Sequence, residues 1–125
     1  MNIFILLWMF FNHIFDDFFL QGCLSSLKQK TWWEAQNNYK DLYKNDYKMA
    51  LFMHSFSWSF LMMLPIFYFN CFNLNGLMLI FFIINIIIHY ITDDTKANKL
   101  KINLVTDQFI HIIQIIVSWI IFIVI

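Results

Sequence analysis

Residues 1–21 read MNIFILLWMFFNHIFDDFFLQ, an apolar run whose second half contains a histidine, two aspartates and a glutamine. The run is close to the ~20 residues that an α-helix needs to cross the hydrocarbon core of a bilayer. Ionisable side chains in such a segment cost free energy, so they call for a partner or a function. The run therefore predicts a membrane helix that carries a polar site towards its end.

The composition of the whole chain agrees with a membrane location. Of its 125 residues, 61% are hydrophobic and only 13% are charged. A soluble domain of this size would have too little polar surface to cover such a core. The formal net charge is zero and arginine is absent, so no basic surface indicates nucleic acid as a partner. We expect an integral membrane protein whose partner is membrane lipid.

Four apolar segments follow one another along the chain. They span about residues 3–21, 49–69, 77–91 and 102–125. Inside lipid a backbone must satisfy its own hydrogen bonds, so these segments should be helices. The sequence predicts an all-α fold, a four-helix bundle that forms a single membrane domain over residues 1–125.

The lysines indicate how this bundle is oriented. All eight fall in the connections between the first and second and between the third and fourth segments. Under the positive-inside rule both connections are cytoplasmic, so both termini face outward. We expect the inner membrane of a bacterium, with Lys-rich loops in the cytoplasm. The lysines are Lys28, Lys30, Lys40, Lys44, Lys48, Lys96, Lys99 and Lys101.

The 24–48 connection is rich in aromatic residues and leaves two interpretations open. Tyr39, Tyr43 and Tyr47 recur every four positions, as three of the lysines do, and Trp32 and Trp33 precede them. One interpretation is a helix lying at the level of the lipid headgroups. The other is an exposed loop with aromatic anchors.

The polar residues of the opening run belong to a repeated pattern. His13 and Asp17 are four residues apart, and Gln21 follows four residues later. Residues four apart lie on one face of a helix. His89 and Asp93 have the same spacing, and Asp107 and His111 have it in reverse.

Two further expectations concern the residues around these pairs. His54 lies in the second segment and has no aspartate at the four-residue spacing. Asp16 and Asp94 each neighbour a paired aspartate but should point elsewhere, so we expect them to be solvated or secondary. Lys96 is placed to pair with Asp93, three residues before it, or with a phosphate.

All of these groups should lie at one level of the membrane, towards the cytoplasm. Four antiparallel helices can then bring them into one cavity. A divalent metal would compensate the buried charge, because imidazole and carboxylate are its usual ligands. Zinc is favoured, with Mn²⁺ or Fe²⁺ as alternatives. The expected ligands are His13, Asp17, His89, Asp93, Asp107 and His111.

The remaining site residues receive supporting roles. We expect His54 to act as a ligand or as a catalytic acid or base. Gln21, Lys96 and Gln108 would orient ligands or hold an anionic group such as a lipid phosphate. The donor set allows one metal or a pair of metals, and an open coordination position would suit hydrolysis.

Several functions stay open at this point. A metal-dependent hydrolase is the first. A proton or divalent-cation path is the second, although the outer halves of the helices offer few polar groups. Polar contacts that only pack the helices are a third explanation of the pairs. The fourth is a non-catalytic interaction protein that uses the aromatic connection. Homo-oligomer formation is also open.

The combined pattern resembles the domain-of-unknown-function family 3307, small membrane proteins of bacteria and phages. The similarity covers nearly the whole chain, although the 22–48 connection is longer than the family pattern. It implies a bacterial or phage membrane protein and no particular activity. A looser similarity is to membrane-bound metal-dependent hydrolases. The matching residues are His13, Asp17, Gln21, His54, His89, Asp93, Lys96, Asp107, Gln108 and His111.

Overall fold

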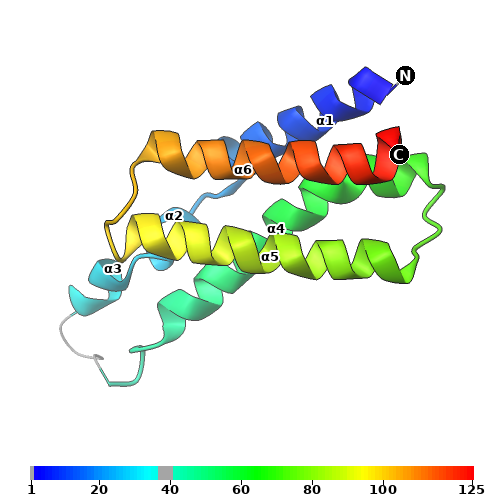
Figure 1. Ribbon diagram of the computed structural model, residues 1–125. Helices are drawn as coiled ribbons and strands as arrows, with labels where there is room; N and C mark the ends of the chain where they lie inside the picture. Colours follow the sequence, from blue (N-terminus) through cyan, green and yellow to red (C-terminus); the bar gives the residue numbers. More distant parts are fainter. Residues whose placement is uncertain (1, 37–40) are drawn as a thin grey trace.

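The computed structural model describes residues 2–36 and 41–125, and within these ranges every regular element is a helix (Figure 1). The prediction of an all-α fold is therefore confirmed. Tyr39 and Lys40, which the sequence pattern placed in the aromatic connection, lie outside the described residues.

Four long helical stretches make up the molecule. Over the described residues, four spans are long and apolar enough to cross a membrane, namely 2–20, 46–69, 76–97 and 104–124. Two of them end in a π-helical segment. The elements are α1 (Asn2–Ile14), η1 (Phe15–Leu20), α2 (Leu24–Leu27), α3 (Lys30–Glu34), α4 (Asp46–Phe69), α5 (Gly76–Ala97), α6 (Leu104–Trp119) and η2 (Ile120–Val124).

The third long helix extends further than predicted. It was expected to end at residue 91, but α5 continues to Ala97. The additional turns are polar in sequence, yet Thr92 and Asp93 are buried within the bundle. A prediction from runs of apolar residues ends the helix at such residues, because the sequence does not show that their partners lie on other helices. Asn75 caps the start of α5 by accepting a hydrogen bond from the Met78 backbone N–H at 2.9 Å.

Within its described residues, the connection between α1 and α4 contains two short helices and turns, not one continuous helix. Two short helices, α2 and α3, follow Gly22, and the Trp33 indole donates a hydrogen bond to the Leu27 carbonyl at 2.7 Å. Tyr43 lies in a turn and Tyr47 within α4. The four-residue series of tyrosines therefore does not mark a single interfacial helix.

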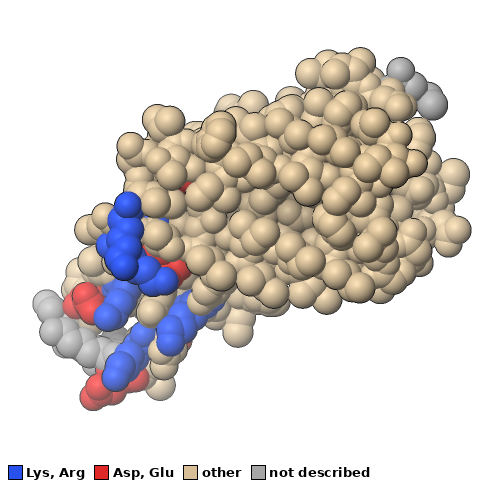
Figure 2. All heavy atoms as spheres, viewed as in Figure 1, with Lys and Arg blue, Asp and Glu red and all other residues tan. Residues whose placement is uncertain are grey.

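The bundle has an apolar half and a polar half. α4 is the most buried of the four spans and packs against α1 and α5. The apolar core lies near the termini, which meet at one end of the bundle (Figure 1). It contains Ile5, Met9, Met62, Met63, Ile66, Phe67, Met78, Ile115 and Ile123, with Trp58 at its inner edge. Charged residues gather at the opposite end, beside α2 and α3 (Figure 2).

Candidate metal centre

One histidine from each long helical span is buried in the polar half. His13, His54, His89 and His111 are between 0% and 3% exposed. The ring centroids of His89 and His111 are 4.2 Å apart and stacked, and those of His54 and His89 are 5.0 Å apart. The helices thus bring together the four imidazoles that the sequence placed at one level.

Trp58 separates this cluster from the apolar core. Its ring stacks on His89 with centroids 4.3 Å apart and also lies 5.1 Å from the His111 ring, so Trp58, His89 and His111 pack against one another. The Trp58 indole N–H also donates a hydrogen bond to His13 Nδ1 at 2.8 Å. Trp58 therefore closes the polar site on the side nearer the termini, and its contacts hold the rings of His13 and His89 in place.

Four buried aspartates surround the imidazoles. His54 Nε2 lies 3.3 Å from Asp17 Oδ1 and 3.4 Å from Asp93 Oδ2. His111 Nε2 lies 3.6 Å from Asp93 Oδ1 and 3.5 Å from Asp107 Oδ1. A charged hydrogen bond would be ~2.7–2.9 Å long. Ligand atoms held tetrahedrally by zinc are instead ~3.3–3.5 Å apart, as bond lengths of ~2.0–2.2 Å require.

The carboxylates are held in place from outside the cluster. Ser57 donates to Asp16 Oδ1 at 2.6 Å, and Gln108 Nε2 donates to Asp17 Oδ2 at 3.1 Å. Asp107 Oδ2 accepts from Lys96 Nζ at 2.5 Å and from Gln108 at 3.1 Å. The other oxygen of each of these aspartates faces a histidine and has no hydrogen-bond partner. Such outer contacts are how proteins orient metal ligands.

Unpartnered polar atoms concentrate in this cluster. Both ring nitrogens of His89 lack a hydrogen-bond partner although the residue is fully buried. His111 Nε2, Asp17 Oδ1 and Asp107 Oδ1 are also buried without a hydrogen-bond partner. Burying one such atom without a partner costs ~1–3 kcal/mol. Five of these atoms in one place indicate that a further group belongs among them.

The hydrogen bonds around His111 determine which nitrogen carries its proton. Gln114 Nε2 donates to the Asn85 side-chain and backbone oxygens at 3.0 and 3.1 Å, so Gln114 Oε1 faces His111 Nδ1 at 3.2 Å. An amide oxygen only accepts, so Nδ1 must hold the proton. In the neutral ring, Nε2 then presents a lone pair towards Asp93 and Asp107.

His54 is arranged in the same way. Gln21 Nε2 donates to the Asp17 backbone carbonyl at 3.2 Å and to His54 Nε2 at 3.3 Å. The proton of a neutral His54 is then on Nδ1, 3.5 Å from Asp16 Oδ2. His54 Nε2 lies near Asp17 Oδ1 and Asp93 Oδ2 while it accepts the hydrogen bond from Gln21, so a metal bound at this nitrogen would have to replace the Gln21 contact.

His13 differs from the other three histidines. Because an indole N–H can only donate, His13 Nδ1 accepts from Trp58, and Nε2 then donates to Gln108 Oε1 at 3.1 Å. Both nitrogens are thus occupied by hydrogen bonds. His13 also lies 3.7 Å from Asp17 Oδ2, but its position suits support of the site better than metal binding.

Asp16 corrects one expectation. It was expected to be solvated or secondary, yet it is 1% exposed and lies beside His54 and Ser57. The cause is η1, because the wider turn of a π-helix brings consecutive side chains closer in direction than an α-helix does. Asp16 and Asp17 therefore both face the interior.

Two lysine contacts were not apparent from sequence spacing. Lys28 is only 5% exposed, and its Nζ lies 2.5 Å from Asp93 Oδ2. Lys96 pairs across the helices with Asp107, also at 2.5 Å, and not with Asp93 on its own helix. The loop position of Lys28 carries no periodic signal, so only the fold reveals its partner.

The formal charges of the cluster do not balance by themselves. Four aspartates face two lysines, which leaves a formal charge of −2 when the histidines are neutral. Buried charge needs compensation by a partner or a bound ion. One divalent cation would supply the missing charge.

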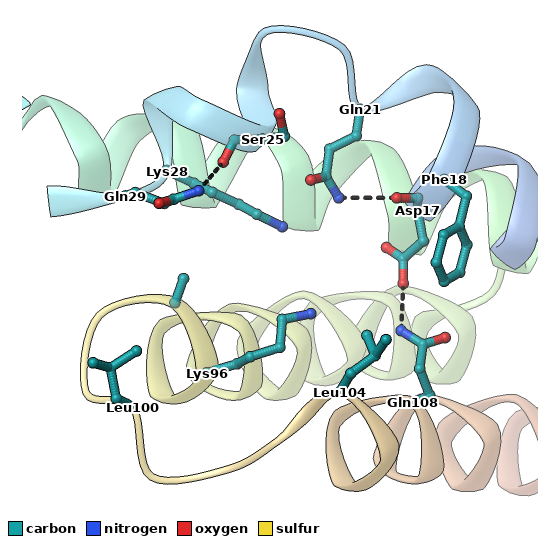
Figure 3. Close-up of a pocket in the computed structure, with 11 residues that line it drawn as sticks. Asp17, Phe18, Gln21, Ser25, Lys28, Gln29, Lys96, Leu100, Leu104 and Gln108 are labelled. Atoms are coloured by element: carbon teal, nitrogen blue, oxygen red, sulfur yellow. Dashed lines mark hydrogen bonds between the residues drawn. The ribbon is translucent and has the colours of Figure 1, made fainter. Parts of the chain in front are cut away.

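A cavity leads to this cluster from the charged end of the molecule. Its volume is about 420 Å³, and Figure 3 shows Lys28 and Lys96 entering it from opposite walls. Asp17, Gln21 and Gln108 also line it, so it reaches the carboxylates from outside.

Comparison of the chain with models of protein families, with curated proteins and with solved structures found no match.

Proposed function

We propose that the buried cluster is a divalent-metal centre. The supporting observation is the convergence of ligand atoms, in which Nε2 of His54 and Nε2 of His111 each lie 3.3–3.6 Å from two carboxylate oxygens, and His111 Nε2 has no hydrogen-bond partner. Lone pairs repel one another unless a cation lies between them. Two groups of ligand atoms are close enough to hold an ion, Asp17 with His54 and His89, and His89 with Asp93 and His111.

The position of Asp93 would also allow a second, adjacent ion, whose additional charge an anionic ligand would have to balance. One of its oxygens faces His54 and the other faces His111. A carboxylate placed between two sites in this way is typical of paired metals, which lie ~3.5–4 Å apart. The mixture of imidazole and carboxylate favours Zn²⁺ and also admits Mn²⁺ or Fe²⁺.

The activity that best suits this centre is metal-dependent hydrolysis. A bound metal would supply an activated water, which is the common role of His and Asp sites with an open position. The cavity beside Asp17 and Gln108 provides access from the lysine-rich end. By the positive-inside rule that end faces the cytoplasm of a bacterial cell.

A second candidate is movement of protons or divalent cations. Gln114 and Asn85 continue the polar chain beyond His111, and Asn85 Nδ2 donates to Ser118 Oγ at 3.1 Å. These side chains are buried and extend towards the apolar half. In this case flux into liposomes would depend on Asn85 and Gln114, whereas hydrolysis would not require a path across the membrane.

The first experiment compares two neighbouring aspartates. Asp93 faces the cluster, whereas Asp94 pairs with the exposed Lys99 at 2.9 Å. We expect detergent-purified protein to contain one or two equivalents of Zn, Mn or Fe by elemental analysis. The Asp93→Asn variant should lose this metal, and the matched Asp94→Asn variant should keep it.

Folding must be checked alongside metal content. The elution volume in size-exclusion chromatography and the helical circular dichroism of both variants should match the native protein. Metal-free native protein that elutes as a folded species and gains no metal on addition of Zn²⁺ would reject the proposal. Equal metal content in the Asp93 and Asp94 variants would reject this ligand set.

A further inference from the structure

The cavity at the charged end carries two ammonium groups on facing walls. Lys28 follows α2 and Lys96 belongs to α5, and both side chains point into the same space (Figure 3). Asp17 and Gln108 lie further in, next to the proposed metal ligands. A ligand that enters from the charged end therefore meets both lysines at the walls of the cavity that leads to the cluster.

The walls of the cavity carry the two lysine ammonium groups together with one carboxylate, that of Asp17. Each ammonium has three N–H donors, and each donates a hydrogen bond to one carboxylate, Lys28 to Asp93 and Lys96 to Asp107. Gln29 adds an amide N–H, whereas the amide of Gln21 and the hydroxyl of Ser25 already donate within the protein. Once a bound cation neutralises the aspartates behind them, the two lysines would attract an anion.

A phosphate group matches this set better than a carboxylate does. It has several acceptor oxygens that can be shared among lysines and amides from different walls. A metal bound behind the lysines would neutralise the negative charge of the aspartates. The positive charge of the two ammonium groups would then act on the ligand. The volume of about 420 Å³ falls in the range of ~300–1,000 Å³ typical of small-molecule sites.

The rim of the cavity is apolar. Phe18 is 56%, Leu100 81% and Leu104 54% exposed. Phe18 and Leu104 lie at the ends of their membrane spans, where hydrocarbon meets the headgroup region. A ligand at this depth would place a polar group among the lysines and an apolar part against the rim.

We propose that this cavity binds the phosphate group of an anionic phosphate ester and thereby defines the substrate class of the metal centre. As a statement about substrate, the inference rests on the proposed hydrolase function. As a statement about binding, it can be tested separately. Hydrolysis of such an ester forms a P–O bond from water and breaks the bond to the alcohol oxygen, which leaves with a proton.

The test is a binding titration with three probes on the detergent-purified full chain. The probes are inorganic phosphate, dihexanoyl phosphatidic acid below its micelle concentration, and the matching uncharged dihexanoylglycerol. Each titration is run before and after addition of Zn²⁺, and the metal content is measured in every sample. We expect the phosphate-bearing probes to bind and the uncharged glyceride to bind at least tenfold more weakly.

Two variants alter the cavity by different means. Lys96→Gln removes one ammonium, and Ala97→Trp fills the cavity from its wall without changing a charge. Both should weaken phosphate binding at least tenfold. Lys99→Gln is the matched control, because Lys99 is exposed and the hydrogen bond that it donates to Asp94 raises its pKa, so this variant also loses a full positive charge. It should bind like the native protein.

The outcomes separate the two proposals and the two ligand sources. Binding that is insensitive to both cavity variants, or equal for the uncharged glyceride, overturns the inference. Tighter binding of phosphatidic acid supports a lipid headgroup as the source, and equal binding of inorganic phosphate supports a soluble one. Phosphate binding by folded protein that takes up no Zn²⁺ would retain the anion site and reject the metal centre, whereas bound Zn²⁺ without phosphate binding would retain the metal centre and reject the anion site.

Discussion

The proton on His111 is placed by residues that do not touch the proposed ions. Gln114 is held by Asn85 through two hydrogen bonds, and its free oxygen then selects Nδ1 of His111 as the protonated nitrogen. The consequence is that Nε2 faces the aspartates as a lone pair. Residues that orient a ligand in this way commonly contribute ~10–100-fold to metal affinity.

Replacement of Gln114 by methionine should therefore weaken metal binding. The variant keeps the approximate shape of the side chain but removes the acceptor for His111 Nδ1. We expect Zn²⁺ affinity to fall ~10–100-fold, measured by competition with a chelator of known affinity. Gln36→Met is the control, because Gln36 is exposed and distant in the fold from α6. Unchanged affinity in the Gln114 variant would contradict this role.

Residue spacing predicted part of the site and could not predict the rest. The His and Asp pairs on α1, α5 and α6 were visible because one helical turn brings both members to the same face. Lys28 and Asn85 were missed because their partners lie on other elements. His54 was treated as lacking an aspartate, yet it contacts Asp16, Asp17 and Asp93 across the bundle.

At the scale of the element, η1 decides how the first span enters the site. The segment Phe15–Leu20 is π-helical and lies between the part of α1 that packs in the apolar half and the turn at Gly22. Asp16 faces His54 and Ser57, and Asp17 faces His54 and Gln108. An α-helix would turn one of the two aspartates away. π-Helical insertions of this kind occur frequently at functional sites.

Deletion of Phe19 should convert this segment to an ordinary α-helical turn. Phe19 is 72% exposed, so little packing is lost, but Asp16 or Asp17 would then turn away from His54. Leaving a buried polar group without its partner costs ~1–3 kcal/mol. We expect a lower melting temperature in detergent and metal binding that is weaker by about tenfold or more.

The second π-helical segment provides the control for this deletion. η2 lies at the end of the last span, away from the histidines. Deletion of Ile121 shortens the chain by one residue and should leave metal affinity unchanged. If both deletions reduce metal binding equally, the effect of Phe19 is a general effect of shortening a span and says nothing about η1.

At the scale of the whole molecule, polarity is divided along the bundle axis. The apolar core occupies the half near the termini, and the described lysines lie at the opposite end (Figure 2). This division was predictable because each long helix changes from apolar to polar at the same level. The third helix was placed too short for the same reason, since its polar end is buried by partners that only the fold supplies.

The native cysteines can test the orientation that follows from this division. Cys23 lies beside α2 at the lysine-rich end, and Cys71 lies in the turn between α4 and α5 at the other end; both are exposed and free. The positive-inside rule places Cys23 in the cytoplasm and Cys71 outside. In intact bacterial cells, a membrane-impermeant maleimide should therefore label Cys71 and leave Cys23 unlabelled until the cells are lysed.

Single-cysteine variants make this measurement unambiguous. Cys23→Ser retains only Cys71 and should be labelled before lysis, whereas Cys71→Ser retains only Cys23 and should be labelled only afterwards. The reverse pattern would place the lysine-rich end outside. The phosphate-binding cavity would then open to the exterior, and substrates confined to the cytoplasm could not reach it. Labelling of both variants before lysis would show that the chain does not adopt a single orientation.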